Sequence, residues 1–290
     1  MAKLRVLRQT PYNRSGAGGI VNFVLLLILA AMMALPMAFT VVNAFKPISE
    51  LFIFPPRLWV SNPTLSNFMG IAGVLRESVV PLERYILNSV IITVVGVVGQ
   101  VIIAALAAYV LAKEQFPGRA FFNGMVVLSL MFNGAVTTIP SYIVMAEIGL
   151  VNNFLALILP TFCSSVGLYL MRQFMEQMIH DAILEAARID GAGEVHIFFR
   201  IVMPMCKPAW LTLIILAFQG AWGNTGGMFI YDEQLKTLPY ALQNVMGGGI
   251  IARAGISSAT ALLLIIPPLT AFIVSQSNIL ETMSTSGMKD

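Results

Sequence analysis

Long stretches without Lys, Arg, Asp or Glu make up most of the chain, and short polar segments separate them. A helix rises about 1.5 Å per residue, so about 20 apolar residues span a bilayer, and one charged residue at the centre would cost roughly 2.5 to 3.5 kcal/mol. Backbone in lipid must satisfy its own hydrogen bonds, and the sequence lacks the period-2 alternation of a membrane barrel. The pattern therefore predicts an all-α integral membrane protein with a single transmembrane domain over residues 1–290. Its six expected transmembrane helices lie at about residues 20–43, 86–111, 120–145, 152–172, 208–230 and 256–279.

The distribution of Lys and Arg predicts how these helices are oriented. With the N-terminus inside, eleven Lys and Arg residues fall on cytoplasmic segments and six on exterior ones, in agreement with the positive-inside rule. This orientation places both termini in the cytoplasm, together with a polar segment at about residues 176–207. Two longer loops, Lys46–Arg84 and Gly223–Gly255, are then outside.

The first apolar stretch also has features of a secretory signal. Basic residues precede it, and Val42-Asn43-Ala44 offers the small residues of a cleavage site. Its apolar run is longer than a usual signal core. We therefore expect a retained anchor helix, with processing as the alternative.

Composition agrees with a membrane protein. Of 290 residues, 58% are hydrophobic and 11% are charged, roughly half the charged fraction of a soluble domain. The formal net charge of +3 is too small to indicate a nucleic-acid partner. Cys163 and Cys206 lie far apart and have no His or Cys neighbours, so we expect neither a disulfide framework nor a metal site.

The polar segment at residues 176–207 has the pattern of two short helices with a bend. Asp181 is a fair N-cap for a helix over residues 182–190, and Gly191 can take the left-handed conformation that ends a helix. Glu194 suits the first turn of the next helix because its charge complements the helix dipole there.

Three adjacent residues of the first short helix suit the docking of another protein. Ala186 and Ala187 are small enough to let another surface approach closely. Glu185 offers a carboxylate for a charge-assisted hydrogen bond to a partner's Arg or Lys. The alternative is an amphipathic helix that lies on the membrane surface.

The string Glu185-Ala186-Ala187-Arg188-Ile189-Asp190-Gly191, followed after nine residues by Ile201-Val202-Met203-Pro204, resembles the EAA loop of bacterial ABC importer permeases. Met203 stands where the family usually has Leu, a replacement of nearly equal volume. Gly193 stands where relatives often carry a capping Ser. The outer-loop strings Asn43-Ala44-Phe45-Lys46-Pro47 and Phe54-Pro55-Pro56 are similar to permeases of polysaccharide and complex-oligosaccharide importers, the branch that includes the smaller maltose permease.

This resemblance implies the MetI-like permease fold and a location in the inner, cytoplasmic membrane of a bacterium. It implies a heterodimer with a second permease subunit, two cytoplasmic ATPase subunits, an extracytoplasmic solute-binding protein and an oligosaccharide or polysaccharide-fragment substrate. ATP and Mg²⁺ would be held by the ATPase subunits, and no cofactor by this chain. The residues that the resemblance assigns to ATPase docking are Glu185, Ala186, Ala187, Arg188, Asp190 and Gly191.

Other function classes lack their chemistry in this sequence. No P-loop string occurs, so ATP hydrolysis would need another subunit. An ion-coupled secondary transporter usually places Asp, Glu or His at mid-membrane, and none of the six stretches contains one. A membrane enzyme would need paired carboxylates or an activated nucleophile, and the adjacent acids Asp232 and Glu233 are typical of a solvated loop. We therefore expect a non-catalytic subunit and keep both classes as alternatives.

Polar side chains within the apolar stretches are candidates for the transport path, because sugars are held by amide hydrogen bonds and ring stacking. Hydrogen bonding between helices is the equal alternative. The outer loop after the fifth helix carries Asp232 and Lys236, and the resemblance implies that it reaches into the binding protein. The candidate path residues are Asn88, Gln100, Asn133, Thr137, Gln219, Trp222 and Asn224.

Overall fold

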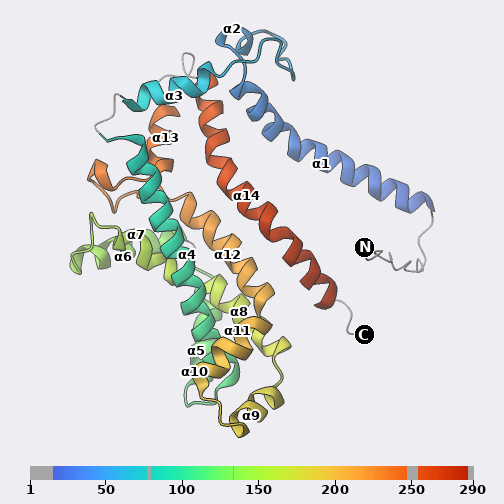
Figure 1. Cartoon of the computed structure of the whole chain (residues 1–290), viewed down its shortest axis with the longest axis vertical. Helices are drawn as coiled ribbons and strands as arrows, with labels where there is room; N and C mark the ends of the chain where they lie inside the picture. The colour runs from blue at the N-terminus through green and yellow to red at the C-terminus, as the bar shows by residue number, and fades with distance from the viewer. Residues whose placement is uncertain (1–15, 77–79, 133, 247–253, 287–290) are drawn as a thin grey trace.

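The computed structural model describes residues 16–76, 80–132, 134–246 and 254–286, and within these ranges every regular element is helical (Figure 1). This confirms the predicted all-α class. The elements are α1 (Gly16–Ala44), α2 (Ile48–Leu51), α3 (Ser66–Arg76), α4 (Leu82–Lys113), α5 (Arg119–Ser129), α6 (Gly134–Glu147), α7 (Leu155–Phe162), α8 (Ser165–Met178), α9 (Asp181–Ile189), α10 (Glu194–Ile197), the π-helical turn η1 (Phe198–Val202), α11 (Met203–Met205), α12 (Lys207–Trp222), the 3-10 turn η2 (Glu233–Leu235), α13 (Leu238–Met246) and α14 (Ala254–Ser286).

Four helical stretches among the described residues are long and apolar enough to cross a membrane. They are Gly18–Ala44, Leu82–Lys113, Leu155–Met178 and Ala254–Val274. A fifth is present if Glu194–Met205 and Lys207–Trp222, which meet at a bend of 80°, form one span. The total of six and the orientation of the termini stay predictions.

The third predicted span, residues 120–145, is two helices rather than one. After Ser129 the backbone hydrogen bonds join residues three apart instead of four. The N–H groups of Leu130, Met131 and Phe132 donate to the carbonyl oxygens of Val127, Leu128 and Ser129. That tightening ends α5 after 11 residues, and α6 has 14. Each is shorter than the roughly 20 residues that a straight span needs.

The fifth predicted span, residues 208–230, is also shorter than predicted. Its helix, α12, ends at Trp222, and the chain then turns through Gly226 and Gly227, both with positive φ. The hydropathy pattern extended the predicted span past this turn because the residues that follow, such as Met228 and Phe229, are apolar.

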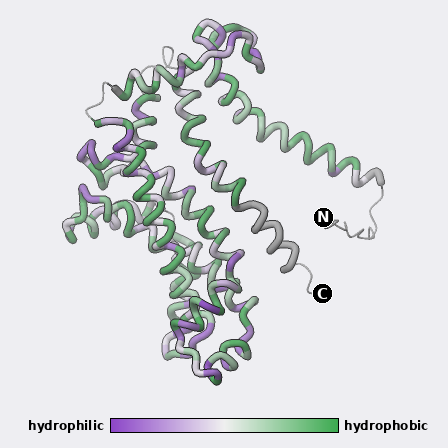
Figure 2. The backbone as a smooth tube through the Cα atoms, viewed as in Figure 1, coloured by the Kyte–Doolittle hydropathy of each residue, from purple (hydrophilic) through white to green (hydrophobic). Residues whose placement is uncertain are grey.

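α4 is the central helix of the structure, and α7, α8 and α12 surround it (Figure 1). Its contact face is built of small residues, so the neighbouring helices come close, as is usual for helices in membranes. Figure 2 shows the same region as predominantly hydrophobic, with hydrophilic residues at the top, in the loops at the left edge and at the lower end. The buried α4 residues of the largest core cluster are Val101, Ala104, Ala105, Ala108, Tyr109 and Ala112.

Two glycines of α4 set its distance from α7. A Cβ on Gly96 would lie 2.9 Å from Oγ1 of Thr161, and a Cβ on Gly99 would overlap the ring of Phe162. The two helices therefore touch backbone to side chain, and larger residues here would force them apart.

Replacing Gly99 by valine should lower the stability of the purified protein by about 1 to 3 kcal/mol, the usual cost of overpacking. Thermal denaturation in detergent measures this effect. Gly124→Val is the matched control, because Gly124 is also helical but a Cβ there has nothing within 4 Å. Equal stability of the two variants would contradict the close α4–α7 contact.

α1 extends away from the other helices and meets α14 (Figure 1). None of its apolar window is buried. Large side chains along it, such as Phe23 and Met33, are more than half exposed. This surface is suited to lipid or to another membrane helix, and not to water.

Candidate functional site

The predicted cytoplasmic segment folds into a bent pair of helices at the lower end of the molecule in Figure 1. α9 ends in a Schellman motif, in which the N–H of Gly191 donates to O of Arg188 at 3.0 Å and the N–H of Ala192 donates to O of Ala187 at 3.0 Å. Gly191 has φ +82°, which confirms the predicted left-handed conformation. Residues 181–197 are called the knob below.

The prediction that Asp181 caps α9 was wrong. His180 holds the N-cap position, and Asp181 is the first helical residue. The Asp181 carboxylate instead accepts a hydrogen bond from Nζ of Lys113 at 2.8 Å, and Nζ of Lys113 also donates to O of Ile179 at 2.6 Å. Lys113 is the last residue of α4, so this contact joins the start of the knob to the central helix.

The adjacent alanines Ala186 and Ala187 lie on different faces of the knob. Ala187 is buried with Leu184 against the core, whereas Ala186 is exposed. Glu185 is exposed too, and no side chain among the described residues pairs with its carboxylate. Ile189 is 86% exposed beside them. An unpaired carboxylate next to a small residue and an exposed apolar side chain can bind another protein.

Arg188 belongs to an internal cluster, called the Arg188 cluster, with Tyr109, Glu114 and Glu194. Nε of Arg188 donates to Glu194 at 2.7 Å, and a terminal nitrogen donates to Glu114 at 2.6 Å. The hydroxyl of Tyr109 donates to the other oxygen of Glu194 at 2.8 Å. Tyr109 and Glu114 come from α4 and its C-cap, so the cluster joins the bend of the knob to the central helix.

These contacts shift the pKa values of the knob's acids. The hydrogen bond from Arg188, then the bond from Tyr109 and last the charge of Arg188, lower the pKa of Glu194 below its ordinary 4.5. Lys113 likewise lowers the pKa of Asp181. Because both folded pKa values are depressed, the stabilisation is present above the ordinary value and is lost as pH falls through the lowered one.

Glu194→Gln should remove this acid dependence around Glu194. Because the pair is about half exposed, the variant should lose no more than about 1 kcal/mol of overall stability. Hydrogen exchange at residues 188–194 should be faster than in the wild type at neutral pH, and the two proteins should converge as the pH falls below the lowered pKa of Glu194. A constant difference between them at all pH values would contradict the role of the ion pair.

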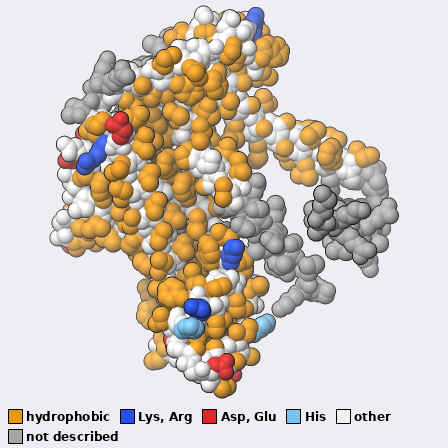
Figure 3. All heavy atoms as spheres, in the orientation of Figure 1, with side chains coloured by type: hydrophobic (Ala, Val, Ile, Leu, Met, Phe, Trp, Pro, Cys, Tyr) orange, Lys and Arg blue, Asp and Glu red, His pale blue; other side chains and the backbone are white. Residues whose placement is uncertain are grey.

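A hollow of about 530 Å³ lies inside the bend of the knob. The side chains of Asp190 and His196 border it, both exposed. Figure 3 shows charged and histidine side chains gathered at this lower end, while hydrophobic atoms cover the middle of the same face. A concave, polar surface at the end of an apolar body is suited to a water-soluble partner. The residues that line the hollow are Ala187, Asp190, Gly191, Ala192, Gly193, His196 and Ile201.

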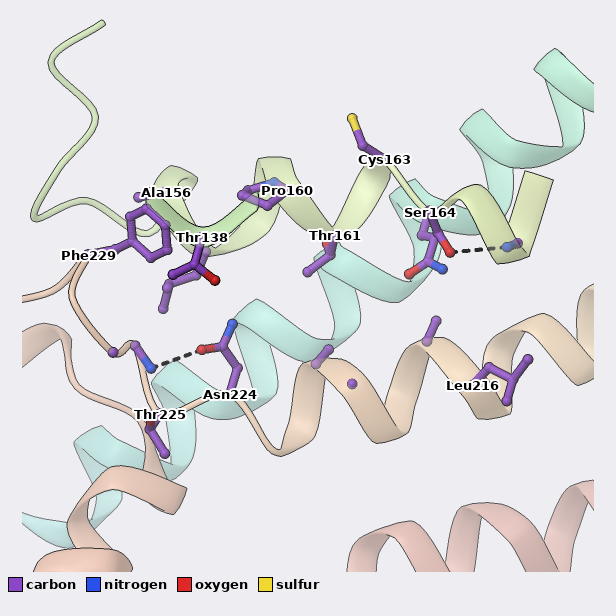
Figure 4. A pocket seen from close by; sticks show the side chains of 18 of the residues that line it. Thr138, Ala156, Pro160, Thr161, Cys163, Ser164, Leu216, Asn224, Thr225 and Phe229 are labelled. Carbon is purple, nitrogen blue, oxygen red and sulfur yellow. Dashed lines mark hydrogen bonds between the residues drawn. The ribbon is translucent and has the colours of Figure 1, made fainter. Parts of the chain in front are cut away.

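A larger cavity, of about 700 Å³, opens between the α7–α8 segment and α12 (Figure 4). Two of the predicted path residues, Gln100 and Asn224, line it. In Figure 4, Thr161 and Ser164 from the α7–α8 side lie across from Asn224 and Leu216. The polar residues that line this cavity are Gln100, Thr138, Thr161, Ser164, Asn224 and Thr225, with Phe229 as the aromatic one.

Asn88 and Trp222 are used inside the protein. Nδ2 of Asn88 donates to the backbone oxygens of Gln234 and Lys236, each at 2.8 Å, so this amide fixes the outer loop to α4. Nε1 of Trp222 donates to O of Leu264 at 3.3 Å and joins α12 to α14. For these two residues the alternative of internal hydrogen bonding describes the structure.

The remaining predicted path residues do not line the cavity. Gln219 is exposed on α12. Oγ1 of Thr137 donates to O of Gly134 at 3.1 Å on the exposed helix α6. Asn133 lies outside the described residues.

Thr161 and Ser164 are cavity residues that sequence inspection missed. They stand at a break between α7 and α8, where Ser164 is the N-cap of α8 and its Oγ accepts from the N–H of Gly167 at 3.1 Å. The signal was present: Pro160, followed by two serines within an apolar run, indicates a helix end and a new cap. Cys163 lies at the same break and is unpaired, as is the buried Cys206.

In the outer loop, Asp232 and Lys236 have different positions. The carboxylate of Asp232 caps η2 by accepting from the N–H of Gln234 at 2.9 Å, and the residue is exposed. Lys236 is buried; its Nζ donates to O of Ile230 at 2.5 Å and lies 4.2 Å from the ring centre of Tyr240. Lys236 therefore holds the loop together from within, and its ammonium group is not presented to a partner.

Comparison with known proteins finds permease components of transport systems. Residues 100–279 match the sequence family described as binding-protein-dependent transport system inner membrane component. The chain is 26% identical over 262 residues to the sn-glycerol-3-phosphate transport system permease protein UgpE of Brucella melitensis, covering 89% of this chain and 93% of that one. It is 29% identical over 206 residues to the diacetylchitobiose uptake system permease protein NgcG of Streptomyces coelicolor, covering 70% and 66%.

A solved structure has the same fold. It is described as the crystal structure of a bacterial ABC transporter involved in the import of the acidic polysaccharide alginate. The TM-score is 0.77 at 24% identity, with 92% of this chain and 99% of the other covered. This likeness confirms the predicted permease fold.

Proposed function

The chain belongs to the family of binding-protein-dependent transport system inner membrane components, which makes it a permease subunit of a bacterial inner-membrane importer, and we propose that it takes up oligosaccharides in an ATP-driven complex. The complex would contain a second permease subunit and two ATPase subunits below the membrane. A solute-binding protein on the outer side would deliver the sugar.

One observation carries the docking of the ATPase: the knob presents Glu185 without an internal partner, while three of its other charged residues, Asp181, Arg188 and Glu194, are paired within the chain. The paired residues fix the knob to α4, and the unpaired carboxylate remains for a basic group of another subunit. We expect Glu185, Ala186 and Asp190 to make direct contact. Arg188, Ala187 and Gly191 would position them.

The contacts between the knob and α4 give a route for coupling. Lys113 and the Arg188 cluster join the knob to the cytoplasmic end of α4, and the same helix carries Gln100 at the cavity. Closure of the ATPase pair would move the knob, and α4 would pass this motion to the cavity as a rigid body. This is alternating access between two discrete arrangements.

The exposed surface of α1 supports the proposal of a second permease subunit. A 27-residue apolar stretch with none of its window buried can pack against a partner's helices as well as against lipid. On the outer side, Tyr231 and Asp232 are among the exposed loop residues, within the described part of the loop, that the binding protein could contact, whereas Lys236 keeps the loop in shape.

The rival classes receive no support from the cavity. Among the described residues that line it there is no Asp, Glu or His to take up protons or sodium, and no paired carboxylates for catalysis. ATP and Mg²⁺ would act on the ATPase subunits, since this sequence has no P-loop string.

The test is uptake into proteoliposomes that hold both permease subunits, with and without the ATPase subunits. The probes, called the sugar panel below, are cellobiose, maltotriose, diacetylchitobiose and trigalacturonate, each offered with the binding protein. We expect uptake of at least one panel sugar that requires ATP and an active ATPase pair. Uptake that continues when the ATPase subunits are left out would contradict the proposal.

A further inference from the structure

Gln100 is a buried amide that the fold itself does not use. It lies near the middle of α4 and is only 7% exposed, and its side-chain amide forms no hydrogen bond with any described residue. Its amide atoms are not among the fully enclosed polar atoms that lack a partner, so they are accessible from the cavity that Gln100 lines. A polar group largely withdrawn from water costs free energy unless something in the cavity bonds to it. An unused amide at this depth therefore points to a ligand or to water in the cavity that it lines.

The neighbourhood keeps the amide at the cavity. A Cβ on Gly167 would lie 3.4 Å from Nε2 of Gln100 and 2.7 Å from a methyl group of Leu213, so only glycine leaves α8 this close to the amide. Ser164, the N-cap of α8, borders the same cavity. Gln100 is thus held by packing against the first turn of α8 rather than by a hydrogen bond.

The chemistry of the lining selects a class of ligand. Amides and hydroxyls come from Gln100, Thr161, Ser164 and Asn224, and the ring of Phe229 borders one end. None of the described lining residues is charged. Amide and hydroxyl groups beside an aromatic ring suit a hydroxyl-rich ring, whereas a carboxylate placed here would have no cationic partner among the described residues that line the cavity.

From these observations we infer that this subunit holds an uncharged sugar ring in the α7–α8–α12 cavity, with the Gln100 amide as the central hydrogen-bonding group. The inference rests on the proposed transport function and adds which part of the chain binds the substrate and which sugars it accepts. A sugar hydroxyl can accept from Nε2 and donate to Oε1 of Gln100 at once.

Asn88 provides a matched control on the same helix. It is also a buried amide, but its Nδ2 makes two hydrogen bonds that hold the outer loop. Gln100→Leu removes no internal hydrogen bond and keeps a similar volume, so thermal stability should be unchanged or higher. Asn88→Leu leaves two carbonyl oxygens unpaired and should lower stability.

The experiment first identifies which panel sugars are taken up by the complete transporter. Each transported sugar is then titrated into the purified transporter without the binding protein. We expect a neutral panel sugar to be transported and Gln100→Leu to raise its Kd about tenfold.

The outcomes separate the two proposals. Uptake of trigalacturonate alone, or a Kd unchanged by Gln100→Leu, overturns the neutral-sugar site and leaves transport standing. A lower thermal stability of Gln100→Leu, equal to that of Asn88→Leu, overturns it as well, because the amide would then be structural. Failure of ATP-dependent uptake for every panel sugar contradicts the proposed function itself.

Discussion

Replacing Glu185 by lysine should abolish sugar-stimulated ATP hydrolysis while leaving the permease folded in the membrane. The carboxylate is exposed and has no partner among the described residues, so the fold loses no contact. In the assembled transporter the new ammonium group would face the basic group that Glu185 is expected to bind. Losing one member of a buried charge pair costs about 2 kcal/mol or more, so coupling should fall about 30-fold or further.

The measurement is ATP hydrolysis with and without a transported panel sugar, in proteoliposomes. Glu147→Lys is the control, because Glu147 is another exposed acid without an ion pair among the described residues, at the end of α6 and away from the knob. It should keep normal stimulation. Normal stimulation in Glu185→Lys would remove this residue from the docking surface.

Gly191→Ser should also disrupt coupling, by a different cause. A serine at φ +82° carries a left-handed backbone penalty of roughly 1 to 2 kcal/mol. The space around the residue is not the problem, because a Cβ there has nothing within 4 Å. The bend between α9 and α10 should open, and coupled hydrolysis should fall several-fold, with increased hydrogen exchange of the Gly191 and Ala192 amides.

Gly193→Ser is the control two residues away. Gly193 borders the same hollow, also has nothing within 4 Å of a Cβ, and has φ −72° and ψ 156°, which any residue adopts. As the N-cap of α10 it should accept serine with unchanged or slightly raised stability. If both variants behave alike, the conformation of Gly191 is not what shapes the knob.

The knob could be predicted because its determinants are local. The end of α9, the left-handed glycine and the first turn of α10 at Glu194 depend on residues within a few positions of one another. The ion pair between Arg188 and Glu114 could not be predicted, because the two residues are 74 positions apart. Nor could the ion pair between Asp181 and Lys113, which are 68 positions apart. Such pairings depend on how α4 packs against the knob.

The path residues show the same limit more clearly. Asn88 and Gln100 are both amides in one apolar stretch, and hydropathy treats them alike. Packing gives Asn88 two carbonyl partners from a loop, 146 and 148 residues away, and leaves the Gln100 side chain with none. Hydropathy also missed the helix breaks after Ser129 and at Cys163, since the residues there remain apolar or small.

The account depends most on contact between the exposed carboxylate of Glu185 and a separate ATPase subunit. Carbodiimide labelling of carboxylates, read by mass spectrometry, measures this contact in the permease pair alone and in the complete transporter. We expect Glu185 to be labelled in the permease pair and protected in the complete transporter, with Glu147 labelled equally in both. Equal labelling of Glu185 in the two preparations would contradict the account.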